Sequence, residues 1–305
     1  MNLLNLFHRT ERADVFALGE KRLAQLKAEN RYSCYRNTRA MLHKLSLFCH
    51  GKSLPADQVT SEMVAEFRDF LLRKMGNSQN TMVENIKILS ILLDEAGLCP
   101  NPCSSLQLSR EQTRREYLLE DEVQRIMDLK LKAGSHLDIA RDIFFMECRT
   151  GLRISDLLQL RWEAYDGVFI RLQMQKTKRP VEVPVTRGVQ RVLEKYRTLF
   201  SSDRSYIFPI LETSRTQKQD FAQARTLVYA TGRINIAIKR LANLAGISKQ
   251  LSSHIGRHTF ATMLISKGAS IYDVKELLGH QDIKVTQVYA HLLDSRKQQL
   301  VEMLE

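Results

Sequence analysis

Cysteine is scarce in this chain of 305 residues, and the few cysteines present do not form recognisable pairs. Their number, five, is odd, and neither a second cysteine pair nor a nearby histidine accompanies Cys99 and Cys103. The sequence therefore predicts neither a disulfide framework nor a cysteine-based zinc site. We expect reduced thiols and a cytoplasmic location instead.

Long hydrophobic runs, internal repeats and low-complexity tracts are absent as well. The initial stretch MNLLNLFHRTERAD has one short apolar patch, broken by His8 and Arg9, which is too short for a signal peptide or a membrane span. A hydrophobic content of 44% beside 26% charged residues is typical of a soluble globular protein. The length is sufficient for two domains, each with its own core.

The charge is unbalanced toward the positive side. Lys and Arg number 46 against 34 Asp and Glu, so the formal net charge is +12. Residues 1–115 hold 17 basic and 12 acidic side chains, so the excess is shared by both parts of the chain. This balance predicts a polyanionic partner, with nucleic acid first and a membrane surface second.

Two regions of different composition indicate two domains. Residues 1–105 have apolar side chains at helical spacing and are expected to form a helical domain. In it, Arg36 and Arg39 are candidates for a DNA-facing surface, although a solvated helix face explains each of them equally well. Residues 106–116 are polar and contain several arginines, which predicts a linker to a second domain at 117–305.

The second domain combines helices with one hairpin. VFIRLQM and PVEVPV alternate apolar and polar residues on either side of the basic stretch QKTKR, which predicts an antiparallel hairpin over 168–185. The rest of the pattern is helical, so we expect a mainly α, α+β fold with a small antiparallel sheet. The helices expected beyond the hairpin span 231–246, 254–267, 271–278 and 293–304.

A pair of histidines raises the question of a metal site. His254 and His258 lie four residues apart, the spacing with which one helix presents two zinc ligands. No glutamate follows His254 as a general base and no third ligand is evident, so a zinc hydrolase is not predicted. We interpret His258 as a residue that packs or caps its helix, and we expect no metal.

Four short segments of the second domain carry polar residues in a distinctive order. They are RTGLRISDLL with Arg153, the hairpin turn with Lys176, SHIGR with His254 and Arg257, and LLGHQDIKVTQVY with His280 and Tyr289. Each residue taken singly has an ordinary structural explanation, such as a solvated helix end. In this order and spacing they resemble the tyrosine recombinase, or phage integrase, family, and the helical first domain resembles that family's core-binding domain.

The resemblance implies a fold and an activity. The fold is an N-terminal helical core-binding (SAM-like) domain followed by a C-terminal mixed helical catalytic domain. The activity is site-specific recombination, which integrates, excises or inverts DNA through a 3′-phosphotyrosyl intermediate. Because the bond energy stays in the protein–DNA link, neither ATP nor a metal cofactor is expected. A type IB topoisomerase-like enzyme and a catalytically inactive DNA-binding relative are the alternatives.

The resemblance also implies roles for the site residues. Tyr289 is the nucleophile, and Arg153 and Arg257 stabilise the negative charge on the non-bridging phosphate oxygens. His254 falls on the histidine that serves as general base or orienting group. His280 falls on a histidine that hydrogen-bonds the scissile phosphate.

A lysine of the hairpin turn donates a proton to the 5′-oxygen leaving group in this family. Lys176 is favoured because it lies eight residues before Pro184, as the family's lysine does before its proline. Lys178 is the alternative and could contact phosphate instead. Asp156, three residues beyond Arg153, matches an acidic position that orients the site, although an ordinary acidic residue at a helix start explains it equally well.

Double-stranded DNA with inverted-repeat core sites is the expected partner, in the bacterial nucleoid. We expect monomers in free solution and a homotetramer in the synaptic complex, and accessory DNA-bending proteins are compatible with this. An apolar stripe predicts a helix over 292–305 that docks on a neighbouring protomer, with burial in its own domain as the alternative. No separate arm-binding domain is evident, so a short family form is expected.

Overall fold

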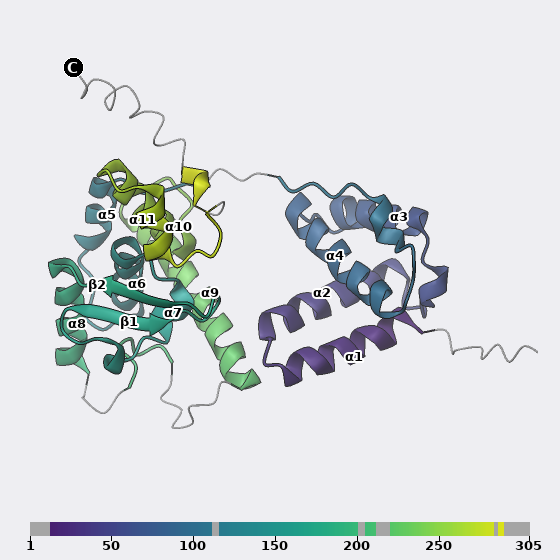
Figure 1. Cartoon of the computed structure of the whole chain (residues 1–305), viewed down its shortest axis with the longest axis horizontal. Helices are drawn as coiled ribbons and strands as arrows, with labels where there is room; N and C mark the ends of the chain where they lie inside the picture. Colours follow the sequence, from purple (N-terminus) through teal and green to yellow (C-terminus); the bar gives the residue numbers. More distant parts are fainter. Residues whose placement is uncertain (1–12, 112–115, 201–204, 212–219, 284–285, 290–305) are drawn as a thin grey trace, which may run out of the picture. The chain divides into compact units, whose positions relative to one another are not determined.

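The computed structural model describes residues 13–111, 116–200, 205–211, 220–283 and 286–289. These residues form two compact units (Figure 1). The first comprises the described residues up to 111 together with 220–225, and the second comprises the remainder. Within these ranges, every helix is too short or too polar to serve as a membrane span. The helix expected over 292–305 lies outside the described residues.

The first unit is helical, and polar side chains cap the starts of α1, α3 and α4. Asp14 Oδ1 accepts the Phe16 N–H at 2.8 Å, and Thr60 and Ser78 cap two later helices in the same way. Apolar side chains from all these helices meet in one core. The elements are α1 (Val15–Ala28), α2 (Tyr32–Phe48), η1 (Ala56–Gln58), α3 (Ser61–Asp69), η2 (Phe70–Lys74), α4 (Gln79–Glu95) and η3 (Pro102–Ser105).

The second unit is organised around α6 (His136–Thr150), which lies at its centre in Figure 1 and packs against α5, α7, α8 and α10. The central position follows from its sequence, because ten of its fifteen side chains are buried. The other helices are α5 (Glu120–Met127), α7 (Ile154–Leu158), η4 (Trp162–Ala164), α8 (Arg187–Leu199), α9 (Phe221–Leu244), α10 (Ser253–Ser266), α11 (Ile271–Leu278) and η6 (Gln287–Tyr289). Of α9, the residues from Thr226 onward belong to this unit.

One hairpin completes the second unit. Strands β1 (Phe169–Gln173) and β2 (Pro180–Pro184) pair antiparallel, with Ile170 opposite Val183. Both of these side chains are buried, whereas neighbouring positions along each strand are more exposed, as the alternating pattern predicted. The small antiparallel sheet expected over 168–185 is confirmed.

The helices near the C-terminal end also follow their predicted spacing. α10 begins and ends one residue before the expected range 254–267, and α11 coincides with the expected range 271–278. α9 begins ten residues earlier than expected, at Phe221. α8 was not predicted, although Thr186 caps it and its apolar side chains lie on one face at helical spacing.

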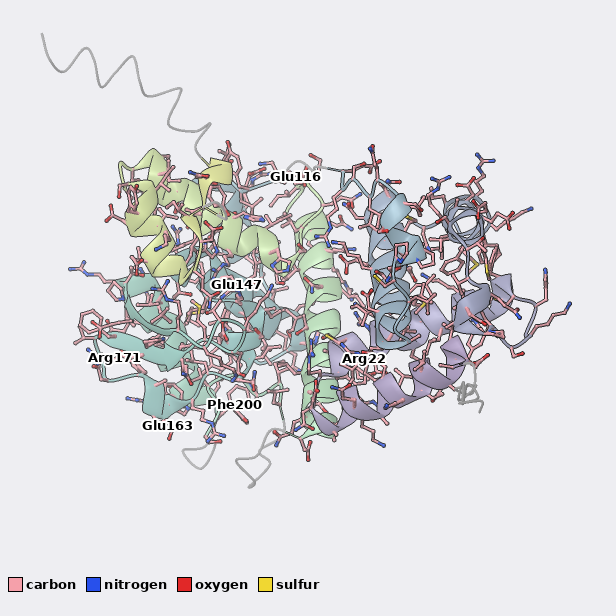
Figure 2. All side chains as sticks on the ribbon, turned by 45° about the vertical axis from the view of Figure 1, so that its right-hand side comes forward. Arg22, Glu116, Glu147, Glu163, Arg171 and Phe200 are labelled. Atoms are coloured by element: carbon pink, nitrogen blue, oxygen red, sulfur yellow. The ribbon has the colours of Figure 1, made fainter. Side chains whose placement is uncertain are left out.

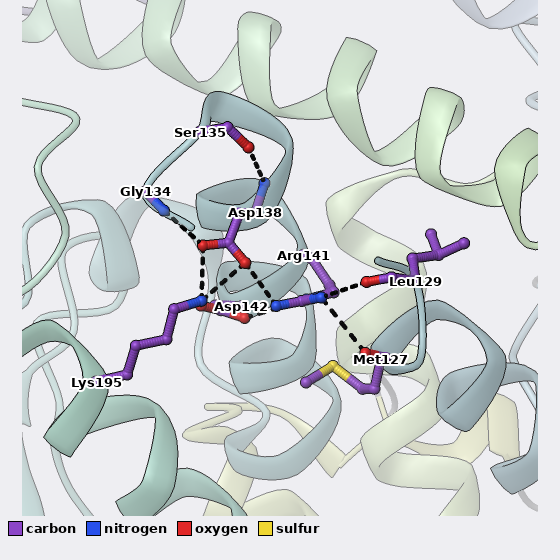
Figure 3. A network of polar contacts seen from close by, with 8 residues as sticks. All are labelled: Met127, Leu129, Gly134, Ser135, Asp138, Arg141, Asp142 and Lys195. Atoms are coloured by element: carbon purple, nitrogen blue, oxygen red, sulfur yellow. Dashed lines mark hydrogen bonds and ion pairs between the residues drawn. The ribbon is translucent and has the colours of Figure 1, made fainter. Parts of the chain in front are cut away.

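A buried ion network joins α6 to α8 (Figure 3). Asp138 and Asp142 lie one turn apart on α6, and both are almost fully buried. Lys195 of α8 reaches both carboxylates, at 2.7 Å and 2.6 Å, while Arg141 pairs with Asp138 at 2.6 Å and donates to the Leu129 carbonyl at 2.9 Å. Two buried negative charges are thus balanced by two cations.

Lys195→Met is expected to destabilise the second unit by about 2–4 kcal/mol, because two buried carboxylates would then share one arginine. Urea unfolding followed by the fluorescence of Trp162, the single tryptophan of the chain, reports on this unit. Lys239→Met, at an exposed position of α9, is the control and should change stability by less than about 0.5 kcal/mol. Equal unfolding midpoints for both variants would contradict a stabilising role of the network.

Candidate active site

The turn between α6 and α7 presents Arg153. Gly151 ends α6 in the left-handed conformation, with φ +67°, and a Cβ at this position would collide with the ring of Phe260. Only glycine therefore fits where α10 crosses the turn. Arg153 follows at the N-cap position of α7. Its Nη1 lies 3.0 Å from the sulfur of Met174, just before the hairpin turn.

Arg257, on α10, is hydrogen-bonded to two other segments of the chain. Its Nη1 donates to the carbonyl of Gly151 at 2.6 Å and its Nη2 donates to the carbonyl of Leu278 at 2.5 Å. The side chain is buried. Because a guanidinium has five N–H donors in a rigid plane, two such bonds fix its orientation beside the turn that carries Arg153 and leave further donors.

The electrostatics of the two arginines favour an anion. Burial lowers the pKa of both side chains, and the positive charge of Arg153 lowers the pKa of Arg257 further. In the part of the chain that the structure describes, no carboxylate lies within ion-pair distance of either guanidinium. Two partly desolvated like charges held close together gain free energy when an anionic group binds between them.

Glu147, labelled inside the second unit in Figure 2, is a buried carboxyl that the sequence did not single out. A Cβ on Gly256 would lie 2.8 Å from the Cβ of Glu147, so this side chain backs the helix turn that carries Arg257. Burial raises the pKa of Glu147 well above its usual value, against the opposing effect of Arg257.

Asp156, in the first turn of α7, connects this helix to the hairpin. Its Oδ1 accepts the backbone N–H of Gln175 at 2.9 Å, where the turn begins. The side chain is buried, and its Oδ2 has no hydrogen-bond partner among the atoms described. Burial raises the pKa of Asp156, while the Gln175 bond and the charge of Arg153 lower it. The carboxylate thereby positions the first residues of the basic turn.

The hairpin turn itself displays two exposed lysines, Lys176 and Lys178. Lys178 adopts a left-handed conformation with φ +56°, and its N–H donates to the carbonyl of Met174 at 2.9 Å. Arg179 next to it donates to the carbonyl of His280 at 2.8 Å. The turn is therefore held against the segment that follows α11.

His280 lies in that segment and is buried. Gly279 before it has φ +59°, and a Cβ there would come within 2.7 Å of the Met174 sulfur, so the chain passes close to the hairpin. His280 Nδ1 lies 2.9 Å from the hydroxyl of Thr286, which is fully buried. This bond fixes the direction of the imidazole ring.

Tyr289 ends the described segment, in η6, and is only 4% exposed. Its ring packs with apolar side chains of α10 and α11, and its hydroxyl is hydrogen-bonded to His258 Nδ1. His254 is exposed one helical turn earlier, on the same side of α10. The interpretation of His258 as a packing or capping residue thus missed its contact with Tyr289, which only the path of residues 279–289 brings about.

Contacts within the second unit link the segments that carry Arg153, Asp156, Arg257, His280 and Tyr289. Lys176, Lys178 and His254 are exposed in the same unit, and Arg36 and Arg39 are exposed on α2 in the first unit. No three His, Cys, Asp or Glu side chains gather as a metal centre would require within the described ranges.

Comparisons with known proteins match both units of the chain. The model of the phage integrase family matches residues 116–296, which is more than half of the chain, and the model of the phage integrase SAM-like domain matches residues 14–97. A tyrosine recombinase of Pseudothermotoga lettingae is 29% identical over 201 residues, covering 65% of this chain and 64% of the relative. Tyrosine recombinase XerD of Brucella suis is 34% identical over 161 residues, covering 50% of this chain and 48% of the relative. The chain thus spans between about half and two thirds of these relatives.

Solved structures share the fold. A lambda integrase dimer bound to a COC′ core site has a TM-score of 0.67 at 16% identity and covers 91% of this chain and 95% of its own. A lambda integrase tetramer bound to a Holliday junction has the same TM-score and identity, covering 92% and 78%. The expected helical fold with a SAM-like domain and a small sheet is confirmed. The two family models together establish that the chain belongs to the phage integrase family of tyrosine recombinases.

Proposed function

We propose that this protein is a site-specific recombinase that cleaves and rejoins double-stranded DNA through a covalent link between Tyr289 and a 3′-phosphate. The observation that carries the proposal is the pair Arg153 and Arg257, which present positive charge beside the Tyr289 segment. A phosphodiester in transesterification gathers charge on its non-bridging oxygens, and fixed guanidinium donors stabilise that charge.

The remaining residues have supporting roles in this proposal. His254 is the general base or orienting group at the scissile phosphate, and His280 hydrogen-bonds that phosphate. A lysine of the hairpin turn protonates the leaving 5′-oxygen. Asp156 keeps the turn in place through the Gln175 N–H. Arg36 and Arg39 on α2, and Lys178, contact DNA phosphates, which hold the protein on the duplex without reading its sequence.

The proposal extends to partners. The DNA carries two inverted core sequences, and four copies of the chain assemble on two such sites, with residues 292–305 linking neighbours. The lambda integrase tetramer on a Holliday junction supports this arrangement through its shared fold. The protein acts in the bacterial cytoplasm, and accessory DNA-bending proteins are compatible with the assembly.

The test begins with the DNA site. Duplexes bound by the protein are selected from a pool of random sequences, and a plasmid carrying two copies of the selected site is incubated with the protein in EDTA. Exchange between the two sites, seen as deletion or inversion of the intervening DNA, is the expected result. Relaxation of supercoils without exchange would indicate a topoisomerase-like enzyme, and binding without cleavage would indicate an inactive relative.

A substrate with a different leaving group tests which of the two hairpin lysines is the general acid. Lys176→Ala is expected to slow cleavage of an ordinary phosphodiester on the order of 10²–10⁴-fold, because the 5′-oxygen then leaves without a proton. A substrate with sulfur at the bridging 5′ position should restore its rate, since a thiolate leaves unprotonated. Lys178→Ala should weaken DNA binding, and its cleavage rate should not rise with the 5′-sulfur substrate. The reverse pattern would assign the acid to Lys178.

A further inference from the structure

The hydroxyl of Tyr289 has a specific neighbour in this fold. His258 Nδ1 is hydrogen-bonded to Tyr289 Oη, and the two rings lie with centroids 5.7 Å apart at an interplanar angle of 60°. The geometry points to His258 as the general base that takes the proton of Tyr289 during strand cleavage. This inference rests on the proposed function, in which Tyr289 is the nucleophile.

The surroundings of Tyr289 explain why a base is needed at this atom. The ring belongs to a buried apolar cluster that also contains Phe260, Ile265 and Val274. An apolar environment disfavours a free phenolate, so the proton has to leave as the bond to phosphorus forms. A neutral imidazole with its proton on Nε2 can accept a proton through Nδ1, the atom that faces the Tyr289 hydroxyl.

The position of His258 on α10 distinguishes it from His254. The two histidines share a face of the helix, but His258 is half-buried and touches η6, whereas His254 is exposed at the first turn. Arg257 lies between them in sequence and is anchored to Gly151 and Leu278, which keeps this stretch of α10 fixed. In this assignment one helix carries both groups. His254 acts at the scissile phosphate, and His258 accepts the proton of the attacking Tyr289 hydroxyl.

The proton and bond changes balance without a further reactant. The Tyr289 Oη–phosphorus bond forms as the bond from phosphorus to the 5′-oxygen breaks. The Tyr289 proton passes to His258 Nδ1, and the 5′-oxygen takes a proton from the hairpin lysine. In religation the 5′-hydroxyl gives its proton back to the hairpin lysine as its oxygen attacks phosphorus. The bond from phosphorus to Tyr289 Oη breaks, and His258 returns its proton to the leaving phenolate.

His258→Asn tests the assignment, because an amide oxygen can accept a hydrogen bond from Tyr289 but cannot take up its proton. Single-turnover formation of the covalent adduct, at saturating protein on the selected site, should slow on the order of 10²-fold or more. The 5′-sulfur substrate should not restore this rate, since the defect concerns the attacking oxygen. His136→Asn, a half-buried histidine at the far end of α6, is the matched control and should cleave like the unmodified protein.

A second variant distinguishes loss of the general base from a structural effect of the substitution. His258→Gly should regain adduct formation when imidazole is supplied in the buffer, which a purely structural role of His258 would not produce. Cleavage by His258→Asn within threefold of the unmodified protein, its recovery with the sulfur substrate, or failure of imidazole to restore His258→Gly would overturn the assignment. Adducts that persist in Tyr289→Phe would instead refute the proposed function on which it rests.

Discussion

Tyr289→Phe is expected to abolish the covalent protein–DNA adduct, a loss on the order of 10⁴-fold or more, while DNA binding is retained. The substitution removes one oxygen, which is the attacking atom in the proposed reaction. The ring is 96% buried among side chains of α10 and α11, and phenylalanine fills the same volume, so the fold should be preserved. The lost hydrogen bond to His258 should cost only about 1 kcal/mol.

The measurement uses a DNA substrate nicked beside the cleavage position, so that the short 5′-hydroxyl strand diffuses away and the adduct accumulates on a denaturing gel. Tyr272→Phe is the matched control, because Tyr272 on α11 is 73% exposed and the chemical change is identical. Full adduct formation is expected from this variant. An adduct from Tyr289→Phe, mapped by peptide analysis to another residue, would show that Tyr289 is not the nucleophile.

Arg153→Ala and Arg257→Ala are expected to slow cleavage by similar factors, on the order of 10²–10³-fold each, but to differ in stability. Each substitution removes a fixed positive charge from beside the proposed phosphate position. Arg257 in addition satisfies the carbonyls of Gly151 and Leu278, so its removal should destabilise the second unit by about 2–4 kcal/mol. Arg153 makes its single described polar contact with a sulfur atom, so its removal should leave stability nearly unchanged.

Two assays separate these effects. Cleavage is measured at saturating protein, which removes any contribution from weaker binding, and stability is followed by the fluorescence of Trp162 in urea. Arg191→Ala, at an exposed position of α8, serves as the control and should behave like the unmodified protein in both assays. Arg153→Ala cleaving at the normal rate would remove the main support for the proposed phosphate site. Equal stability of the two variants would show that the Arg257 anchors contribute little.

Much of the fold was predictable because the elements near the site are local in sequence. The hairpin over 168–185 and helix α11 follow from alternation and helical spacing, and the SAM-like first domain follows from the family resemblance. α8 was missed although its cap and apolar face are visible in the sequence, and α9 was placed too short. Both lie in stretches that carry none of the distinctive polar residues.

The identity of the candidate site residues could also be proposed from the sequence, since Arg153, Arg257 and Tyr289 stand in a recognisable order. The groups that these side chains contact could not be predicted from the sequence. Arg257 bonds to carbonyls 106 and 21 residues away in sequence, and His258 contacts Tyr289 across 31 residues. Spacing along one helix says which side chains share a face, and it cannot say which distant segment will meet that face.

The sequence alone was sufficient for the family, the basic character and the set of polar residues, because these depend on residue type and order. The contacts among these residues depend on tertiary packing. Gly151 lets α10 approach the turn before Arg153, and Arg257 hydrogen-bonds both that turn and the end of α11. The position of η6 then brings Tyr289 against His258. A histidine that seemed to belong to a metal pair or a helix cap is thereby placed at the hydroxyl of Tyr289, the proposed nucleophile. Backbone approach distances and long-range hydrogen bonds produce this result, and neither is encoded in local periodicity.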